Sequence, residues 1–193
     1  MSDEPRELST IALDGNQYTV EQSFIRNKYA AYDENGDLLL RAKQKLLKMK
    51  EEFPFVDADG NEVFVVKAGG ILDVAGNYAI EDAETGEQIA VLDNDYSIFQ
   101  DTWKIRDGET EAKLAEINSR GALVTMARTL VPIVGPFIPH KYEITDQHGT
   151  HVGNIDGQLS LRDRYDIVID DAEDVPKDAV VAAAMVIDAI QGN

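Results

Sequence analysis

The stretch AVVAAAMVIDAI, residues Ala179 to Ile190, is a helical run that is apolar on every side, with Asp188 as its single charge. A helix on a protein surface has an apolar stripe and a polar back, whereas a helix that is apolar all round must be enclosed. Nearly all of the upstream sequence consists of short extended runs joined by turns that contain glycine. We therefore expect a β-sheet that wraps around this C-terminal helix.

The upstream sequence repeats one pattern: an extended run, an Asp, a few polar residues with a Gly, and a second extended run. Asp caps a tight turn through its side chain and Gly accepts a positive φ, so the pattern predicts β-hairpins. The turn residues are Asp33, Asp57, Asp82, Asp107 and Asp146. These five hairpins supply ten strands, and the runs 18–23 and 164–170 bring the expected number to twelve.

An eight-stranded barrel has room inside only for side chains, so enclosing a helix takes about eleven strands or more. We predict a mainly β fold: one domain over residues 1–193, with a twelve-stranded barrel, a peripheral segment 1–17 and a buried helix 175–191. Asp174, Pro176 and Asp178 mark the start of the helix, and Gly192 marks its end. The alternative is a helix packed on one face of an open sheet.

The chain is strongly acidic, with 36 Asp and Glu against 18 Lys and Arg and a formal net charge of −18. Nucleic-acid-binding proteins neutralise phosphates with basic surface, so this balance argues against a nucleic-acid partner. The acids are spread along the chain rather than gathered in a tail. We interpret them as a solubility device for a salty, halophilic cytoplasm, where salt screens their mutual repulsion; the alternative is an acidic surface for a cationic partner.

The absence of cysteine excludes disulfides, thiolate metal sites and thiol nucleophiles. The start MSDEPRELS lacks the basic and apolar regions of a secretory signal, and the terminal helix is shorter than the ~20 residues that span a bilayer. We expect a protein that is not transmembrane and is cytoplasmic, or peripheral at the membrane.

Four stretches and the closing helix give the chain a resemblance to a known family. They are KQKLLKMKEEFPFVDADGNEVFVVKAG (43–69), YAIEDAETGEQIAVL (78–92), DTWKIRD (101–107) and LRDRYDIVIDD (161–171). The chain resembles the LURP-one-related family, within the wider group of tubby-like C-terminal domains and phospholipid scramblases. The resemblance implies a twelve-stranded barrel around a central helix. It also implies a poorly defined function, with phosphoinositide binding, membrane tethering or lipid movement in related groups. No catalytic set is established for the family, so none is carried over to this chain.

A basic segment stands out against the acidic background. It contains Arg41, Lys43, Lys45, Lys48 and Lys50. If residues 38–45 are extended, the first three share one strand face, where they could hold a phosphate or an anionic lipid headgroup. The alternative is a solvated outer face that pairs with neighbouring carboxylates.

The stretch GALVTMARTLVPIVGPFIPH (121–140) is rich in apolar residues and in proline. Proline disfavours a central strand, and the apolar content is high for an exposed loop. The stretch could form an interface with a second subunit or touch a membrane, and the alternative is a plug packed inside the barrel. The candidate interface residues are Val131, Ile133, Phe137 and Ile138.

Two patterns suggest metals but are explained more simply as hairpin turns. His148 and His151, three residues apart on a strand and turn, point in different directions and do not converge as ligands must. The run Asp57 to Glu62 has the beginning of a calcium loop, but the twelfth position, which needs a glutamate, is Ala68. We expect no metal and no cofactor.

No phosphate-binding loop or nucleophile motif is present in the sequence. We therefore expect a non-enzymatic binding module whose partner is an anionic phospholipid or a protein. The alternatives are a scaffolding protein that dimerises, and a small-ligand carrier or enzyme with a cavity beside the central helix.

Overall fold

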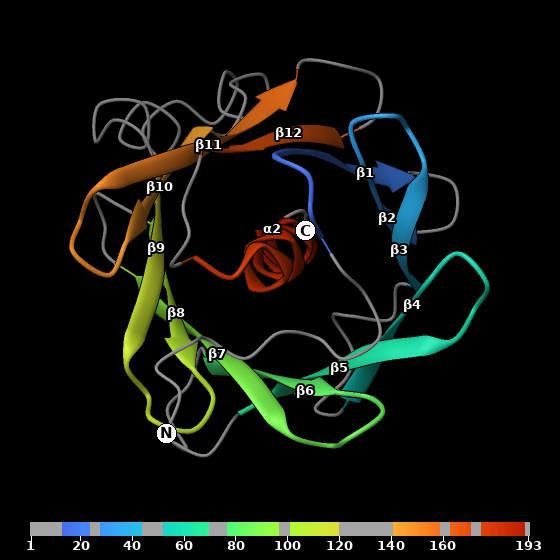
Figure 1. The fold of residues 1–193 in the computed structure, drawn as a ribbon, viewed down its shortest axis with the longest axis horizontal. Helices are drawn as coiled ribbons and strands as arrows, with labels where there is room; N and C mark the ends of the chain where they lie inside the picture. Colours follow the sequence, from blue (N-terminus) through green and yellow to red (C-terminus); the bar gives the residue numbers. More distant parts are fainter. Residues whose placement is uncertain are drawn as a thin grey trace.

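The chain folds as a closed barrel around one helix. The computed structural model describes residues 13–23, 28–43, 52–69, 77–96, 101–119, 141–158, 163–170 and 175–191. Within these residues, twelve β-strands surround a single α-helix, which Figure 1 shows at the centre of the barrel. The predicted mainly β barrel with an enclosed C-terminal helix is confirmed, and the alternative of an open sheet is wrong.

The strands follow one another around the barrel in chain order. They are β1 (Gln17–Ser23), β2 (Lys28–Tyr32), β3 (Leu38–Lys43), β4 (Glu52–Val56), β5 (Glu62–Ala68), β6 (Asn77–Asp82), β7 (Gln88–Tyr96), β8 (Asp101–Asp107), β9 (Lys113–Ser119), β10 (Lys141–Asp146), β11 (His151–Gln158) and β12 (Asp163–Ile169), followed by α2 (Lys177–Gln191). Each strand is antiparallel to its neighbours, and β1 pairs with β12, from Gln17 opposite Val168 to Gln22 opposite Asp163. This last pairing closes the barrel.

The interior is filled by α2 and by side chains from the wall. Every residue from Ala179 to Ile187 is at most 6% exposed, as expected for a helix without a polar face. The helix lies against β1 and β2 on one side and β7 and β8 on the other. Large wall residues fill the remaining space: Trp103 is fully buried, and Phe55 and Phe64 stack with their ring centroids 4.3 Å apart.

A proline, an acidic first turn and a hydrogen bond to the segment before β1 mark the start of α2. Pro176 precedes the first helical residue, Lys177, and Asp178 places a carboxylate in the first turn, as predicted. The ammonium of Lys177 donates a hydrogen bond of 2.9 Å to Asn16 Oδ1, just before β1. The predicted cap Asp174 and the predicted end at Gly192 lie outside the described residues.

The five predicted Asp turns are confirmed. In the β4–β5 turn, Asp57 Oδ1 accepts the backbone N–H groups of Gly60 and Asn61 at 2.7 and 2.8 Å, so this run is a hairpin turn. Bonds of this kind hold the pKa of three of the turn carboxyls below its ordinary value. For Asp33 the largest cause is the hydrogen bond from the backbone N–H of Asp37. For Asp57 it is the bond from the side-chain amide of Asn61, and for Asp146 it is the bond from the backbone N–H of Thr150.

The two ends of the barrel carry different connections, because successive connections between antiparallel strands alternate between the ends. The end that we call the turn end carries the five Asp turns, residues 33–37, 57–61, 82–87, 107–112 and 146–150, and the start of α2. At the other end, which we call the loop end, residues 24–27, 44–51, 70–76, 97–100, 120–140 and 159–162 connect the strands.

One turn departs from the pattern, and this generates a prediction. Four Asp turns place a glycine at positive φ, whereas the β8–β9 turn has Glu111 there, at φ 59°. A side chain in this conformation costs about 1 kcal/mol. Glu111→Gly should therefore raise the free energy of unfolding by up to about 1 kcal/mol in urea denaturation followed by the fluorescence of Trp103. Glu109→Gly, at a position without positive φ in the same turn, should lower it; a loss in both variants would contradict the argument.

A glycine inside a strand generates a second prediction. A Cβ atom added to Gly153 on β11 would lie 2.3 Å from the backbone oxygen of Val168 on β12, so the two backbones pack directly. Gly153→Ala should lower the free energy of unfolding by on the order of 2 kcal/mol. The matched control is Gly15→Ala, whose Cβ would lie 3.6 Å from its nearest neighbour, Tyr18 Oη. Equal urea midpoints for the two variants would show that the close approach is unimportant.

Candidate functional site

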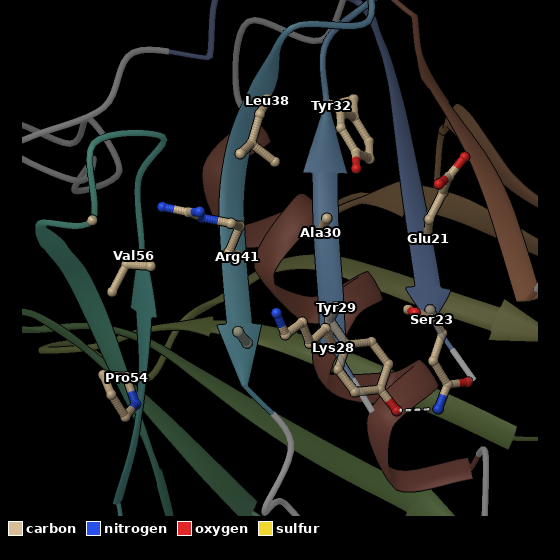
Figure 2. A pocket seen from close by; sticks show the side chains of 13 residues that line it. Glu21, Ser23, Lys28, Tyr29, Ala30, Tyr32, Leu38, Arg41, Pro54 and Val56 are labelled. Carbon is tan, nitrogen blue, oxygen red and sulfur yellow. Dashed lines mark hydrogen bonds between the residues drawn. The ribbon is translucent and has the colours of Figure 1, made fainter. Parts of the chain in front are cut away.

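A groove of about 650 Å³ runs along the outer face of the barrel over β1 to β4 (Figure 2). Its lining residues are Glu21, Gln22, Ser23, Lys28, Tyr29, Ala30, Tyr32, Leu38, Arg41, Ala42, Pro54, Val56 and Gly60. The basic segment predicted from the sequence begins in this groove, at Arg41. The groove therefore brings together part of the predicted anion site and residues from three other strands.

The groove exists because two neighbouring strands are barely paired. Between β3 and β4 the register contains only Arg41 opposite Val56 and Ala42 opposite Phe55, whereas the flanking pairs β2–β3 and β4–β5 each contain five residue pairs. Pro54 lies in β4 and has no N–H to donate to a neighbouring strand. Ala30 lies between Glu21 and Arg41 at the base of the groove, and its short side chain leaves space above it (Figure 2).

Arg41 holds the two sides of this weak seam together. Its Nη2 group donates hydrogen bonds of 3.2 and 3.0 Å to the backbone oxygens of Asp57 and Ala58, in the β4–β5 turn. Within the part of the chain that the structure describes, its remaining guanidinium N–H groups have no hydrogen-bond partner and no carboxylate lies within ion-pair distance. Arg41 therefore has a structural role and retains donors for an anion.

Lysines face each other where the groove reaches the loop end. The register places Lys28, the first residue of β2, directly opposite Lys43, the last residue of β3. Like charges at such positions destabilise a sheet, and an anion between them removes the repulsion. Lys28 is exposed, and no carboxylate lies within ion-pair distance among the described residues. The side chain of Lys43 lies outside the described residues, so its position here rests on the register alone.

A buried amide lies beside these lysines. Gln22 is 7% exposed, and its Nε2 group donates a hydrogen bond of 2.8 Å to the hydroxyl of Tyr29, the dashed line in Figure 2. Its Oε1 atom is buried without a partner among the described residues.

Two described cations elsewhere on the wall are paired with carboxylates. Lys67 Nζ lies 3.1 Å from Glu52 Oε1 and 2.6 Å from Glu81 Oε2, and these carboxylates raise its pKa through hydrogen bonds. Arg106 pairs with Asp93 at 3.2 Å. Neither cation belongs to the basic segment that begins at Arg41.

A second outer groove, of about 670 Å³ over β12, β1 and β2, is unsuited to an anion. Its lining includes Asp33, Glu34 and Asp166. Its one cation, Arg164, is already held by Asp166 at 3.1 Å and by Glu21 at 3.7 Å. The groove over β1 to β4 is therefore the better candidate.

The predicted site residues fall into two groups. Arg41 and the backbone of Lys43 are described and lie on β3, as the predicted extended run requires. The others, Lys45, Lys48, Lys50, Val131, Ile133, Phe137 and Ile138, lie outside the described residues. Sequence reasoning missed Lys28, Gln22 and Tyr29, because only strand register places them beside Arg41 and Lys43.

The two histidines lie at a hairpin, as predicted. His148 lies in the β10–β11 turn, and His151 begins β11 with its Nε2 atom 3.1 Å from Asn154 Oδ1. In the described ranges, no three His, Asp or Glu residues are gathered closely enough to hold a metal ion. No described helix is long and apolar enough to span a bilayer.

Comparisons with known proteins agree with this architecture. The model of the LURP-one-related family matches residues 16–188, and no curated protein matches the chain. An X-ray structure of a protein from Arabidopsis thaliana is similar, with a TM-score of 0.56 and 11% sequence identity over 93% of this chain and 94% of that chain. At this identity the likeness shows the fold alone. The family match extends from the start of the barrel into α2, and the chain therefore belongs to the LURP-one-related family.

Proposed function

We propose that this protein is a non-enzymatic binding module that takes an anionic group, a lipid headgroup or a small anion, at the groove over β1 to β4. The observation that supports this most is which cations have a carboxylate partner and which do not. In a chain of net charge −18, the wall residues Lys67 and Arg106 are paired with carboxylates, whereas Lys28 and Arg41 have no carboxylate partner among the described residues. Binding an anion would supply the missing counter-charge.

The local geometry gives further support. Lys28 and Lys43 are opposite each other, and Arg41 lies two residues from Lys43 along β3. The basic residues Lys45, Lys48 and Lys50 follow directly in the sequence and add to the positive potential near the loop end. Lipid headgroups attract such clusters by about 1 kcal/mol per basic residue near the surface.

A small-ligand carrier or enzyme with a cavity beside the helix is less well supported. That function needs space next to α2, whereas the wall seals the helix from Ala179 to Ile187. The fold therefore favours ligand binding on the outer surface of the barrel.

Flotation with phosphatidylcholine vesicles, with and without phosphatidylserine, tests the proposed lipid site. Removing two charges with Lys28→Gln/Lys43→Gln should weaken binding to anionic vesicles by on the order of tenfold or more. Reversing charge with Lys43→Glu/Lys45→Glu should weaken it further. The matched control, Lys67→Gln/Lys113→Gln, also removes two charges from the outer wall and should retain binding.

The outcomes separate the sources of the anion. Binding by the wild-type protein that is unchanged in the Lys28/Lys43 and Lys43/Lys45 variants would reject the site. If vesicles do not bind but inorganic phosphate raises the melting temperature of the wild type and not of Lys28→Gln/Lys43→Gln, the site takes a free anion. All assays need matched ionic strength, because salt screens these contacts.

We also propose that the acidic surface adapts the protein to a salty cytoplasm. The charge of −18 disfavours the folded state through self-repulsion, which salt screens within a few ångströms. The melting temperature should therefore rise steadily with KCl concentration. The variant Glu34→Gln/Asp59→Asn/Glu84→Gln/Glu109→Gln, which removes four turn-end charges, should show a smaller rise. A melting temperature that does not change with salt would contradict this adaptation.

A further inference from the structure

The groove over β1 to β4 is cationic toward one end of the barrel and apolar toward the other. On the outer face of the sheet, the register places Lys28 opposite Lys43 toward the loop end and Tyr32 opposite Leu38 toward the turn end. Figure 2 shows the same division, with Tyr32 and Leu38 on neighbouring strands at the top of the view and Lys28 below them. The groove therefore has a polarity along the barrel axis.

The half of the groove next to the turn end, which we call the apolar half, consists of Tyr32, Leu38 and Val56. All three side chains line the groove and are half-buried. Between them and the lysines lie Arg41 and, directly opposite it on β2, Ala30, which contributes only a methyl group. A molecule with one charged end could therefore contact a cation and apolar surface at the same time.

The other half, which we call the cationic half, consists of Lys28, Arg41 and, by register alone, Lys43. Lys28 and Arg41 are diagonal neighbours across β2 and β3, a spacing that long side chains can bridge. The one acid among the described lining residues, Glu21, lies 3.7 Å from Arg164 on β12 and so already has a cationic partner. Charge complementarity in this half requires an anionic group.

The size and the mixed lining of the groove suit a small molecule. Binding sites for small molecules have volumes of ~300–1,000 Å³ and combine apolar side chains with a few polar groups that fix the orientation of the ligand. The groove, at about 650 Å³, lies within this range. An inorganic anion would occupy the cationic half and leave the apolar half exposed to water.

We propose that the groove binds a dissolved anionic amphiphile, whose phosphate or carboxylate lies in the cationic half and whose alkyl or aryl body covers the apolar half. This inference rests on the proposed function, because the charged group would occupy the proposed anion site, and it adds the class of ligand. Burial of the apolar body against the groove adds a hydrophobic contribution to the charge-assisted hydrogen bonds of the cations.

The apolar half adjoins acidic turns, which favours a dissolved ligand over a lipid held in a bilayer. The turns 33–37 and 57–61 follow directly from the strands of the apolar half and contain five acidic residues and no basic residue. An anionic bilayer that reached the apolar half would approach these carboxylates, and their repulsion opposes this contact. A single molecule whose charged group points toward the loop end keeps its own charge away from the turns.

Alkyl phosphates of increasing chain length, used below the concentrations at which they form micelles, test this inference by isothermal titration calorimetry. Each methylene that leaves water tightens binding by up to about fourfold, so octyl phosphate should bind the full-length protein at least about tenfold more tightly than ethyl phosphate. Octyl glucoside has the same chain without the charge and should bind much more weakly than octyl phosphate.

Variants separate the apolar contacts from the charged ones. Leu38→Thr/Val56→Thr removes apolar surface and keeps residues suited to a strand, so it should weaken octyl phosphate binding by about tenfold and leave ethyl phosphate binding unchanged. The matched control is Val168→Thr, at the exposed valine of β12 outside this groove, and it should retain the dependence on chain length. Lys28→Gln/Lys43→Gln should weaken the binding of every alkyl phosphate.

The outcomes distinguish this inference from the proposed function. Equal wild-type affinities for ethyl and octyl phosphate, both lost in the lysine variant, would overturn the amphiphile and leave the proposed function standing. Octyl glucoside that binds as tightly as octyl phosphate, or octyl phosphate binding that Leu38→Thr/Val56→Thr leaves unchanged, would also overturn it. If no alkyl phosphate binds, this inference fails, and the proposed function fails with it only when anionic vesicles and inorganic phosphate do not bind either.

Discussion

The burial of α2 on all sides constrains the rest of the structure. A helix whose residues from Ala179 to Ile187 have no polar face must be surrounded, and a small barrel has no room for it. Twelve strands of five to nine residues give the required circumference, and the pairing of β1 with β12 closes the barrel. At ~1.5 Å per residue the helix is about 22 Å long, so it extends through much of the barrel. Alanines at 182–184 allow close approach to the wall, and large side chains such as Trp103 fill the wider gaps.

Filling the interior in this way restricts where ligands can bind. The wall and the helix exclude solvent from the centre, so the polar chemistry lies on the outer face and at the two ends. On the outer face, the weak β3–β4 seam interrupts an otherwise continuous ladder, and Arg41 spans it through the Asp57 and Ala58 carbonyls. Arg41 therefore stabilises the seam, which is the place on the outer face where we propose that an anion binds.

Sequence reasoning reached most of the fold because the fold depends on local signals. The apolar run at the C-terminus and the Asp turns at 33, 57, 82, 107 and 146 are each visible in a few consecutive residues, and together they fix the number of strands and the enclosed helix. The site was only partly predictable. Lys28 stands alone in the sequence, and it becomes part of a cluster only because the β2–β3 register places it opposite Lys43. Gln22 likewise looks like an ordinary strand residue until its partner Tyr29, across the β1–β2 pair, is known.

The large negative charge and the affinity for anions proposed here are compatible because the barrel topology separates the charges. Successive antiparallel connections alternate between ends, so the acidic Asp turns all lie at one end, and Lys28, the first residue of β2, lies at the other. At an ionic strength where the Debye length is ~10 Å or less, an anion beside Lys28 would feel that cation much more than the acids at the far end of a helix about twice that length. Net charge alone would therefore mislead about the partner. The position of each charge along the barrel axis is the more informative quantity.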